Sequence, residues 1–203
     1  APMLDPKPGE RVLDLCAAPG GKTVLMSGDM RDSGVLVACD VRTRRVALLR
    51  DTIRQAGCRH VHPIHVPAER ALPFASGFDR ILVDAPCSGL GTVRRDPDVK
   101  GRRHESDLAG FADRQLTLLD RAATVLKPGG RLVYATCSSE PEENEMVVDR
   151  FLGSHSTFRL IDLRREGRSE LAPVVDERGM LRTLPFKHRL EAFFAAALVQ
   201  YSR

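Results

Sequence analysis

The stretch CAAPGGKT, residues 16–23, joins a strand pattern to the start of a helix and thereby sets the fold class. The preceding run RVLDL (11–15) is apolar, as buried strands are, and the glycines allow a ligand to approach the backbone closely. The final Gly-Lys-Thr matches the end of a phosphate-binding P-loop, but that motif needs glycine where this chain has Cys16. The dinucleotide pattern G-x-G-x-x-G is absent as well. These differences argue against a nucleoside triphosphate as the ligand.

Short apolar runs alternate with helical patterns along the chain. Strand patterns occur at 11–15, 35–40, 60–66, 79–85 and 131–137, and helical patterns at 44–57, 111–130 and 141–153. The segment 191–202 fits a strand or a helix, whereas 162–187 reads as a long irregular connection. This alternation predicts an α/β fold with a doubly wound, mostly parallel sheet. Ligands of such sheets bind at the carboxyl ends of the strands, which is where the chain's unusual motifs occur.

Size and composition indicate one globular domain. The 203 residues suit a single domain over 1–203, and an apolar content of 42% is ordinary for a globular chain. Position 1 is Ala, so we expect a fragment of a longer protein. The sequence shows no membrane-spanning run and no secretory signal, and its five cysteines lack zinc-ligand spacing. We therefore expect a cytoplasmic monomer with reduced thiols and no metal.

The basic residues are clustered. The net charge of +4 permits binding to nucleic acid without requiring it. Clusters at 42–45 and 163–168 are typical of solvated faces. A third cluster, RRDPDVKGRRH at 94–104, closely follows a cysteine loop and is the better candidate for contact with a polyanion.

Asp40 ends the second strand pattern, about 20 residues beyond the glycine loop, where an acidic residue can accept both hydroxyls of a ribose. S-adenosylmethionine fits this arrangement, because it has a ribose but no phosphates. Alternatively, Asp40 caps the next helix, which is predicted to begin near Thr43 or Arg44. Both interpretations remain open from the residues alone.

Two further cysteines lie in loops that follow strand patterns. Cys87 lies in DAPCSGLG (84–91) and Cys137 in ATCSS (135–139). A lone buried cysteine is usually a core residue. Two thiols after neighbouring strands, each flanked by Ser, Pro or Gly, favour a chemical role in one pocket. A disulfide is the alternative, and a reducing compartment argues against it.

These motifs together resemble those of the Sun/RsmB-type RNA cytosine-5 methyltransferases. The similar segments are LDLCAAPGGKT, DRILVDAPCSGLGTVRRDPDVK, LKPGGRLVYATCSSEPEENE and LP…H…FF, in the expected order over nearly the whole chain. The resemblance implies a class I S-adenosylmethionine-dependent methyltransferase fold with an antiparallel last strand at FFAAALV. It further implies transfer of a methyl group to carbon 5 of cytosine in ribosomal or transfer RNA, with S-adenosylmethionine as cofactor.

The resemblance also implies roles for individual residues. Cys137 would be the nucleophile that adds to the cytosine, Cys87 would assist release, and Asp84 would contact the base. Lys22 would orient Asp84 and lower a thiol pKa. The implied cofactor contacts are Cys16, Ala17, Ala18, Pro19, Gly20, Gly21, Lys22, Asp40, Arg45 and Asp84. The implied RNA contacts are Arg94, Arg95 and Lys100.

The chain departs from the family pattern at three places. The family usually has Asp after the third strand, near the adenine, and here Ala68 or Glu69 lies near that point. Gly101 replaces a Trp, and Glu191-Ala192 replaces Asp-Gly. Members also carry an N-terminal RNA-binding extension, which we expect to lie outside these 203 residues. A noncatalytic RNA-binding module therefore remains an alternative, as does a small-molecule methyltransferase or thiol redox enzyme on the same fold.

Overall fold

The structure is a computed structural model that describes residues 2–68, 70–75, 77–101, 104–167 and 169–201. The chain divides into two compact units. The first unit comprises Ala1–Asp84 and Arg121–Val133, and the second comprises Ala85–Asp120 and Tyr134–Tyr201. Helix α4 (Ser106–Val125) and strand β5 (Leu126–Thr136) each contribute residues to both units.

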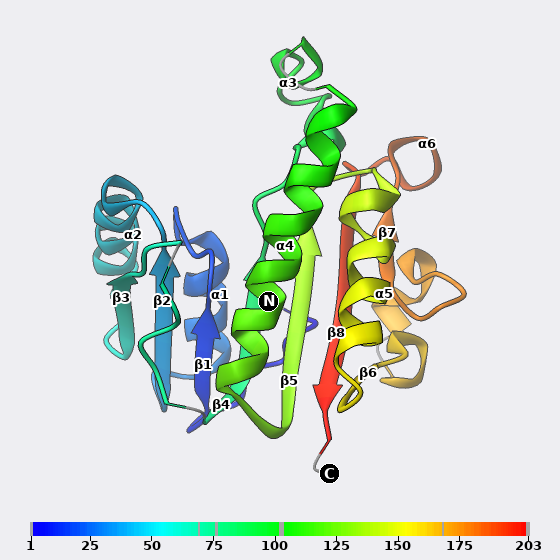
Figure 1. The fold of residues 1–203 in the computed structure, drawn as a ribbon. Coiled ribbons are helices and arrows are strands. Elements are labelled where there is room, and N and C mark those ends of the chain that lie inside the picture. The colour runs from blue at the N-terminus through cyan, green and yellow to red at the C-terminus, as the bar shows by residue number, and fades with distance from the viewer. Residues whose placement is uncertain (1, 69, 76, 102–103, 168, 202–203) are drawn as a thin grey trace. The chain divides into compact units, whose positions relative to one another are not determined.

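The first unit is built on parallel strands in the order β3-β2-β1-β4-β5 (Figure 1). Their bounds are β1 Arg11–Asp14, β2 Val35–Asp40, β3 Val61–His65 and β4 Phe78–Asp84. Strand β1 pairs in parallel with β2 on one side and with β4 on the other. The strand order therefore reverses at β1, and ligands bind at such a switch point in sheets of this kind. These four strands lie within one residue of their predicted bounds.

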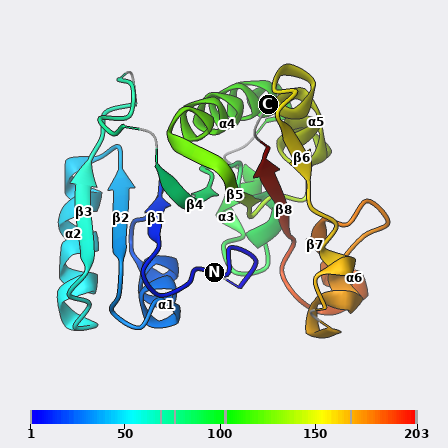
Figure 2. The same ribbon diagram turned by 90° about the horizontal axis from the view of Figure 1, so that it is seen from below.

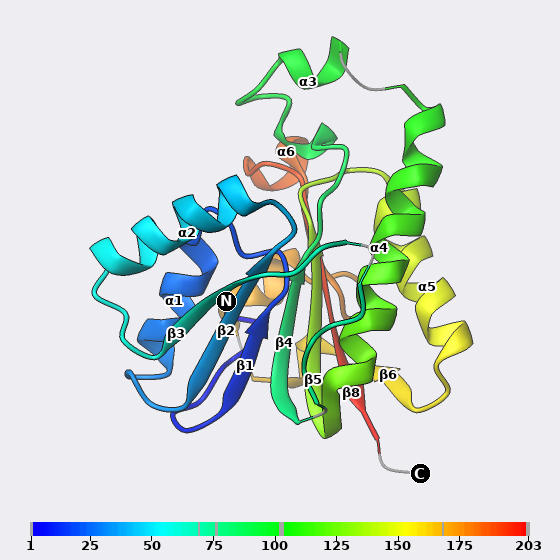
Figure 3. The same ribbon diagram turned by 60° about the vertical axis from the view of Figure 1, so that its left-hand side comes forward.

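Two helices follow the first two strands. Helix α1 (Gly21–Asp29) follows β1, and helix α2 (Thr43–Gln55) follows β2 and lies beside β2 and β3 (Figures 1 and 3). The stripe that predicted α2 is buried, with Val46, Leu49 and Ile53 facing the core.

The second unit contains the last strand, β8 (Phe193–Gln200). Strands β6 (Phe158–Leu160) and β7 (Leu181–Thr183) both pair with β8 in antiparallel orientation (Figure 2). The segment that fitted a strand or a helix thus forms the strand β8, and the predicted α/β class with an antiparallel last strand is confirmed. The short elements of this unit are η1 Leu90–Thr92, α3 Asp98–Gly101, η2 Pro141–Glu143, α5 Glu145–Ser154, η3 Leu163–Arg165, η4 Ser169–Val174 and α6 Pro185–His188.

Three boundaries differ from the predictions. The helix expected at 111–130 begins at Ser106 and ends at Val125, and the Pro-Gly-Gly at 128–130 lies within β5. The helix expected at 141–153 is a 3-10 turn followed by α5. The connection 162–187 contains β7 and short 3-10 segments, which are too short to show a periodic pattern.

The described residues form neither a membrane-spanning helix nor a metal-binding cluster. None of their helices is both long and apolar enough to span a bilayer. No group of three or more His, Cys, Asp or Glu side chains among them is placed to hold a metal ion.

Candidate active site

The loop after β1 is tied to the strands on both sides of it. The backbone N–H of Leu15 donates to the carbonyl of Leu82 in β4 at 2.9 Å, and that of Ala17 donates to Cys39 in β2 at 2.8 Å. Gly20, which precedes α1, has φ of 117°. A β-carbon there would lie 3.0 Å from side-chain atoms of Leu49 and Thr52 in α2, so glycine lets the loop pack against that helix.

This loop borders a cavity of about 330 Å³ in the first unit. Its lining residues are Asp14, Cys16, Ala17, Ala18, Pro19, Gly21, Lys22, Leu25 and Asp84. Most of the predicted cofactor residues therefore surround one cavity. Gly20, Asp40 and Arg45 are not among its lining residues, and Asp14 and Leu25 are lining residues that we did not predict.

Asp14 is the most unusual group in this cavity. It is 1% exposed, and its Oδ2 accepts a hydrogen bond from the Thr23 hydroxyl at 2.7 Å. Its Oδ1 is buried without a hydrogen-bond partner among the described residues. Burial raises the pKa of Asp14 from 3.8 to about 7, against the hydrogen bond from Thr23, which lowers it. An acid that ends a buried strand before a glycine loop was a signal for this residue in the sequence.

Lys22 and Asp84 are brought together at the same cavity. The Lys22 ammonium donates to Asp84 Oδ2 at 2.7 Å, and both side chains are partly exposed. Lys22 lies in the first turn of α1 and Asp84 ends β4, so the contact joins the elements on either side of the switch point. The lysine of the apparent P-loop thus faces a carboxylate.

Asp40 and Arg45 form a second polar contact behind the loop. Asp40 is buried, and its Oδ1 accepts from the backbone N–H of Arg42 at 3.1 Å, just before α2 begins. The Arg45 guanidinium lies 3.5 Å from Asp40 Oδ2 and also donates to the carbonyl of Ala18. This bond closes a turn before α2, whose N-cap is Arg42 and has no side-chain cap, so the helix-cap alternative for Asp40 is wrong. Arg45 links Asp40 to the loop.

The two thiols lie together in the second unit. Cys87 Sγ and Cys137 Sγ are 2.9 Å apart, and the backbone N–H of Cys137 also points at Cys87 Sγ, at 3.3 Å. All five cysteines are free. The hydrogen bond to Cys137 and burial both raise the pKa of Cys87 well above its usual range. The effect that we expected of Lys22 on a thiol pKa stays a prediction.

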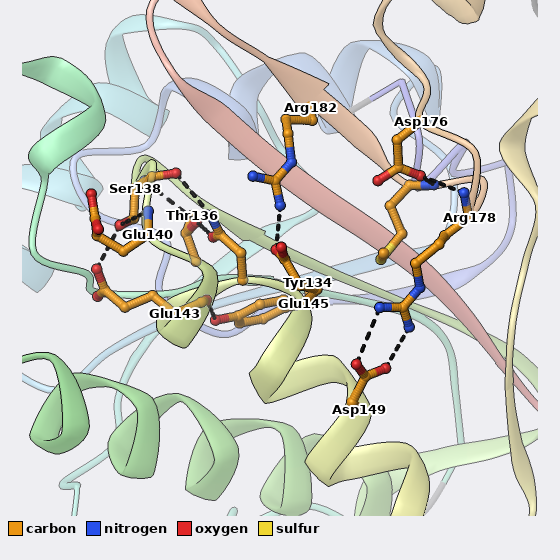
Figure 4. A network of polar contacts seen from close by, with 12 residues as sticks. Tyr134, Thr136, Ser138, Glu140, Glu143, Glu145, Asp149, Asp176, Arg178 and Arg182 are labelled. Carbon is orange, nitrogen blue, oxygen red and sulfur yellow. Dashed lines mark hydrogen bonds and ion pairs between the residues drawn. The ribbon is translucent and has the colours of Figure 1, made fainter.

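The Cys137 loop is held by a buried hydrogen-bond network, part of which Figure 4 shows. The Thr136 hydroxyl donates to Asn144 Oδ1, and Asn144 Nδ2 donates to the Ser138 carbonyl at 3.0 Å. These bonds tie the residues on both sides of Cys137 to Asn144.

The sequence profile of the family described as "16S rRNA methyltransferase RsmB/F" matches residues 1–199. The chain belongs to the RsmB/F family. This membership confirms the resemblance drawn from the motifs.

Individual relatives agree with the family. The chain is 38% identical over 202 residues to a probable ribosomal RNA small subunit methyltransferase B of Bacillus subtilis, covering 98% of this chain and 45% of that protein. It is 35% identical to a human 28S rRNA (cytosine(4447)-C(5))-methyltransferase, covering 98% of this chain and 26% of that protein. The chain thus spans less than half the length of these relatives.

Solved structures share the fold. A methyltransferase homolog from Pyrococcus horikoshii is 36% identical with a TM-score of 0.81, covering 98% of this chain and 64% of that one. NSun6 from the same organism, solved with SFG, is 27% identical with a TM-score of 0.87, covering all of this chain and 50% of that one.

The departures from the family pattern have visible consequences. Glu191 pairs with Arg95 at 2.8 Å, and the Ala192 N–H donates to the Gly91 carbonyl at 3.1 Å. Gly101 ends the short helix α3. Ala68 does not line the cavity of the first unit. Its carbonyl accepts a hydrogen bond from the Arg121 guanidinium at 3.2 Å. Glu69 lies outside the described residues.

The predicted RNA-binding residues border a second cavity, of about 500 Å³, in the second unit. Arg94 and Arg95 line it together with Arg189, Leu190 and Glu191. Arg189, Leu190 and the nearby Phe186, which is 85% exposed, were not predicted. Lys100 lies in α3, and its side chain is not described, as is also true of Arg102 and Arg103.

Proposed function

We propose that this chain transfers a methyl group from S-adenosylmethionine to carbon 5 of a cytosine in RNA, through a covalent bond between Cys137 and the base. The observation that supports it best is the 2.9 Å distance between the sulfur atoms of Cys87 and Cys137. A covalent cycle has an addition step and a release step, and each step can use one thiol. Two adjacent thiols therefore fit such a cycle better than a role in packing.

Carbon 5 of cytosine is a poor nucleophile by itself. When the Cys137 thiolate forms a bond to carbon 6, the electrons of the 5,6 double bond make carbon 5 nucleophilic, and it can then take up the methyl group. The proton on carbon 5 must afterwards leave to water. Its electrons restore the double bond and expel Cys137 as a thiolate, so that every bond formed to the protein is broken again.

Cys87 is assigned to the release step. Its raised pKa keeps it as a neutral thiol, so its S–H can donate a hydrogen bond to the sulfur of Cys137. A donor at that distance stabilises the departing thiolate. A neutral thiol is itself a weak nucleophile, which favours Cys137 for the addition step.

The cavity of the first unit fits the cofactor. Asp14 Oδ1 is buried without a partner in its wall and requires a donor, such as the ammonium group of S-adenosylmethionine. We assign the cofactor to this cavity and to Asp14, with Asp40 reserved for the ribose. When bound, the cofactor supplies an electrophilic methyl group on a sulfonium. The NSun6 relative was solved with SFG, an S-adenosylmethionine analogue.

Asp84 is assigned to the edge of the cytosine. Lys22 holds its Oδ2, which leaves Oδ1 to accept from the exocyclic amine of the base, or from the ring nitrogen once that nitrogen is protonated.

The arginine-lined cavity is assigned to the RNA backbone. Arg94 and Arg189 present guanidinium groups suited to phosphates, and Arg95 becomes available when its exposed ion pair with Glu191 opens. The exposed ring of Phe186 is three residues from Arg189 and can stack on an unpaired base. We therefore propose single-stranded RNA as the form that binds here. Ribosomal RNA in the cytoplasm is the favoured target, since the relatives are named for it.

Methylation of unstructured RNA with labelled S-adenosylmethionine, followed by bisulfite sequencing, tests this function. We expect protected cytosines that disappear when Cys137 is changed to Ala. RNA binding without any methylation would instead support a noncatalytic module. Methylation of small molecules but not of RNA would support a small-molecule methyltransferase.

A further inference from the structure

Glu143 is a carboxylate buried between the two thiol loops of the second unit. Glu143 is fully buried, and its two carboxylate oxygens accept four hydrogen bonds. Oε1 accepts from the backbone N–H of Ser88 at 2.8 Å and from Gln115 Nε2 at 2.9 Å. Oε2 accepts from the hydroxyls of Ser88 at 2.5 Å and Ser138 at 2.6 Å. A carboxylate has room for about four donors, so its acceptor capacity is filled.

The two serines are the residues that directly follow the two thiols. Ser88 follows Cys87 and Ser138 follows Cys137, and their hydroxyl oxygens lie 3.2 Å apart. One carboxylate thus fixes the chain immediately after each cysteine. If either loop shifted relative to the other, a buried oxygen of the Glu143 carboxylate would lose a hydrogen-bond donor. Leaving a buried charged oxygen without a donor is costly in free energy.

Glu143 is in turn held rigidly. Gln115 also donates to the carbonyl of Pro86 at 3.1 Å, and the Tyr134 hydroxyl is near both Gln115 Oε1, at 3.0 Å, and the carbonyl of Glu143, at 2.5 Å. Figure 4 shows Glu143 reaching toward Ser138 beside the ring of Tyr134. The carboxylate is therefore a fixed point to which both loops are attached.

We propose that Glu143 is the positioning residue that sets the distance between Cys87 and Cys137. A negative charge near a thiol raises its pKa, so Glu143 would hinder the formation of a thiolate and cannot serve by activating one. Its contribution is the geometry of the thiol pair. The importance of that geometry for catalysis rests on the proposed function, whereas the geometry itself can be tested without RNA.

The rate at which diamide oxidises the two thiols reports how closely they are held together. Diamide takes two protons and two electrons from a pair of adjacent thiols, which form a disulfide while its N=N bond becomes a hydrazine. We expect rapid formation of a Cys87–Cys137 disulfide in the unmodified protein, detected by mass spectrometry of peptides. Glu143→Ala should slow it by about tenfold or more, because the effective concentration of one thiol at the other falls.

Glu145→Ala is the matched control. Glu145 lies two residues further on and pairs with Arg182, so its loss removes a neighbouring ion pair and leaves the bonds of Glu143 intact. We expect it to form the disulfide at a rate close to that of the unmodified protein. Equal slowing by both substitutions, or no slowing by Glu143→Ala, would overturn the proposal.

Glu143→Gln separates geometry from charge and serves if Glu143→Ala does not fold. Its amide nitrogen can take the place of Oε2, where the two serine hydroxyls can turn to accept, while its oxygen keeps the donors of Oε1. We expect near-normal rates of disulfide formation for Glu143→Gln and slower rates for Ser138→Ala. Slow disulfide formation in Glu143→Gln with normal rates in Ser138→Ala would contradict a positioning role. If the rates follow our expectation but no variant methylates RNA, the proposed function fails and the positioning role stands.

Discussion

The backbone N–H of Gly91 donates to the carbonyl oxygen of Cys137 at 3.0 Å, so the loop that contains Cys87 is joined to the residue assigned as nucleophile. The contact is close on both sides. A β-carbon at position 91 would lie 2.6 Å from that oxygen and 2.3 Å from the carbonyl oxygen of Ala192. Backbone cannot yield as easily as a flexible side chain, so only glycine fits here.

Gly91→Ala should therefore displace the Cys137 loop. We expect a loss of about 1–3 kcal/mol in the free energy of unfolding, as is typical of overpacking, and a large loss of methyl transfer. Gly110→Ala is the control, because Gly110 lies within α4 with open space around its β-carbon position. That change should stabilise the protein by about 0.5–1 kcal/mol in urea unfolding. Destabilisation by Gly110→Ala, or none by Gly91→Ala, would contradict this account.

The raised pKa of Asp14 predicts a pH dependence of stability. The folded state holds its proton up to about pH 7, whereas an exposed Asp loses it near pH 4. Between these values the folded state binds more protons, so the free energy of unfolding should fall as pH rises from about 4 to about 7. Asp14→Asn should remove this part of the slope, as measured by urea unfolding at several pH values. An unchanged slope would show that Asp14 titrates normally.

The same group predicts a pH dependence of cofactor binding. Only the ionised carboxylate attracts the ammonium of S-adenosylmethionine, so affinity should rise by up to about tenfold per pH unit below pH 7 and level off above it. Calorimetry on the unmodified protein and on Asp14→Asn isolates this contribution from the titration of the ligand. Parallel curves for the two proteins would remove Asp14 from the cofactor site.

Asp40→Asn distinguishes a ribose contact from a purely structural one. Asn keeps an oxygen for the N–H of Arg42 and so preserves the turn before α2. If Asp40 also accepts from the ribose, affinity for S-adenosylmethionine should fall by roughly 1–3 kcal/mol with little change in thermal stability. Unchanged affinity would leave Asp40 with the structural contact only.

The arginine-lined cavity predicts two separable effects on RNA binding. Phe186→Ala should weaken binding of single-stranded RNA by about 1–3 kcal/mol without changing its salt dependence, because stacking releases no ions. Arg189→Ala should reduce the slope of log affinity against log salt by about 0.7. Leu48→Ala, which removes a 52% exposed apolar side chain from α2, is the control and should change neither. Equal effects of Phe186→Ala and Leu48→Ala would remove the stacking contact.

The sequence was most informative where local pattern determines structure. The apolar run VLVACD predicted the observed bounds of β2. A strand that is buried on both faces can be recognised from a continuous apolar run, without knowledge of its neighbours in the sheet. The glycine loop predicted the position of the cavity that we assign to the cofactor, because a loop of small residues after a strand is a local feature of the sequence. The family motifs identified the two thiols.

Residues whose role depends on distant partners were not predictable. Glu143 belongs to an acidic stretch that reads as a helix start, and only the fold brings it to Ser88, 55 residues away. Arg189 and Phe186 lie in the connection that we read as irregular, and their exposure follows from packing rather than pattern. Sequence alone could not show that Asp40 bonds the N–H of Arg42 before α2 and faces Arg45, since these contacts depend on how the chain turns after β2.

The covalent role of Cys137 is the central claim, and trapping of protein–RNA adducts tests it most directly. The intact protein should be incubated with RNA and S-adenosylmethionine and analysed on denaturing gels. Cys87→Ala removes a group used only for release, so we expect adducts that accumulate and survive denaturation. Cys137→Ala should give neither adduct nor methylated cytosine. Adducts with Cys137→Ala and none with Cys87→Ala would reverse the two roles, and full activity in both variants without any adduct would contradict covalent catalysis.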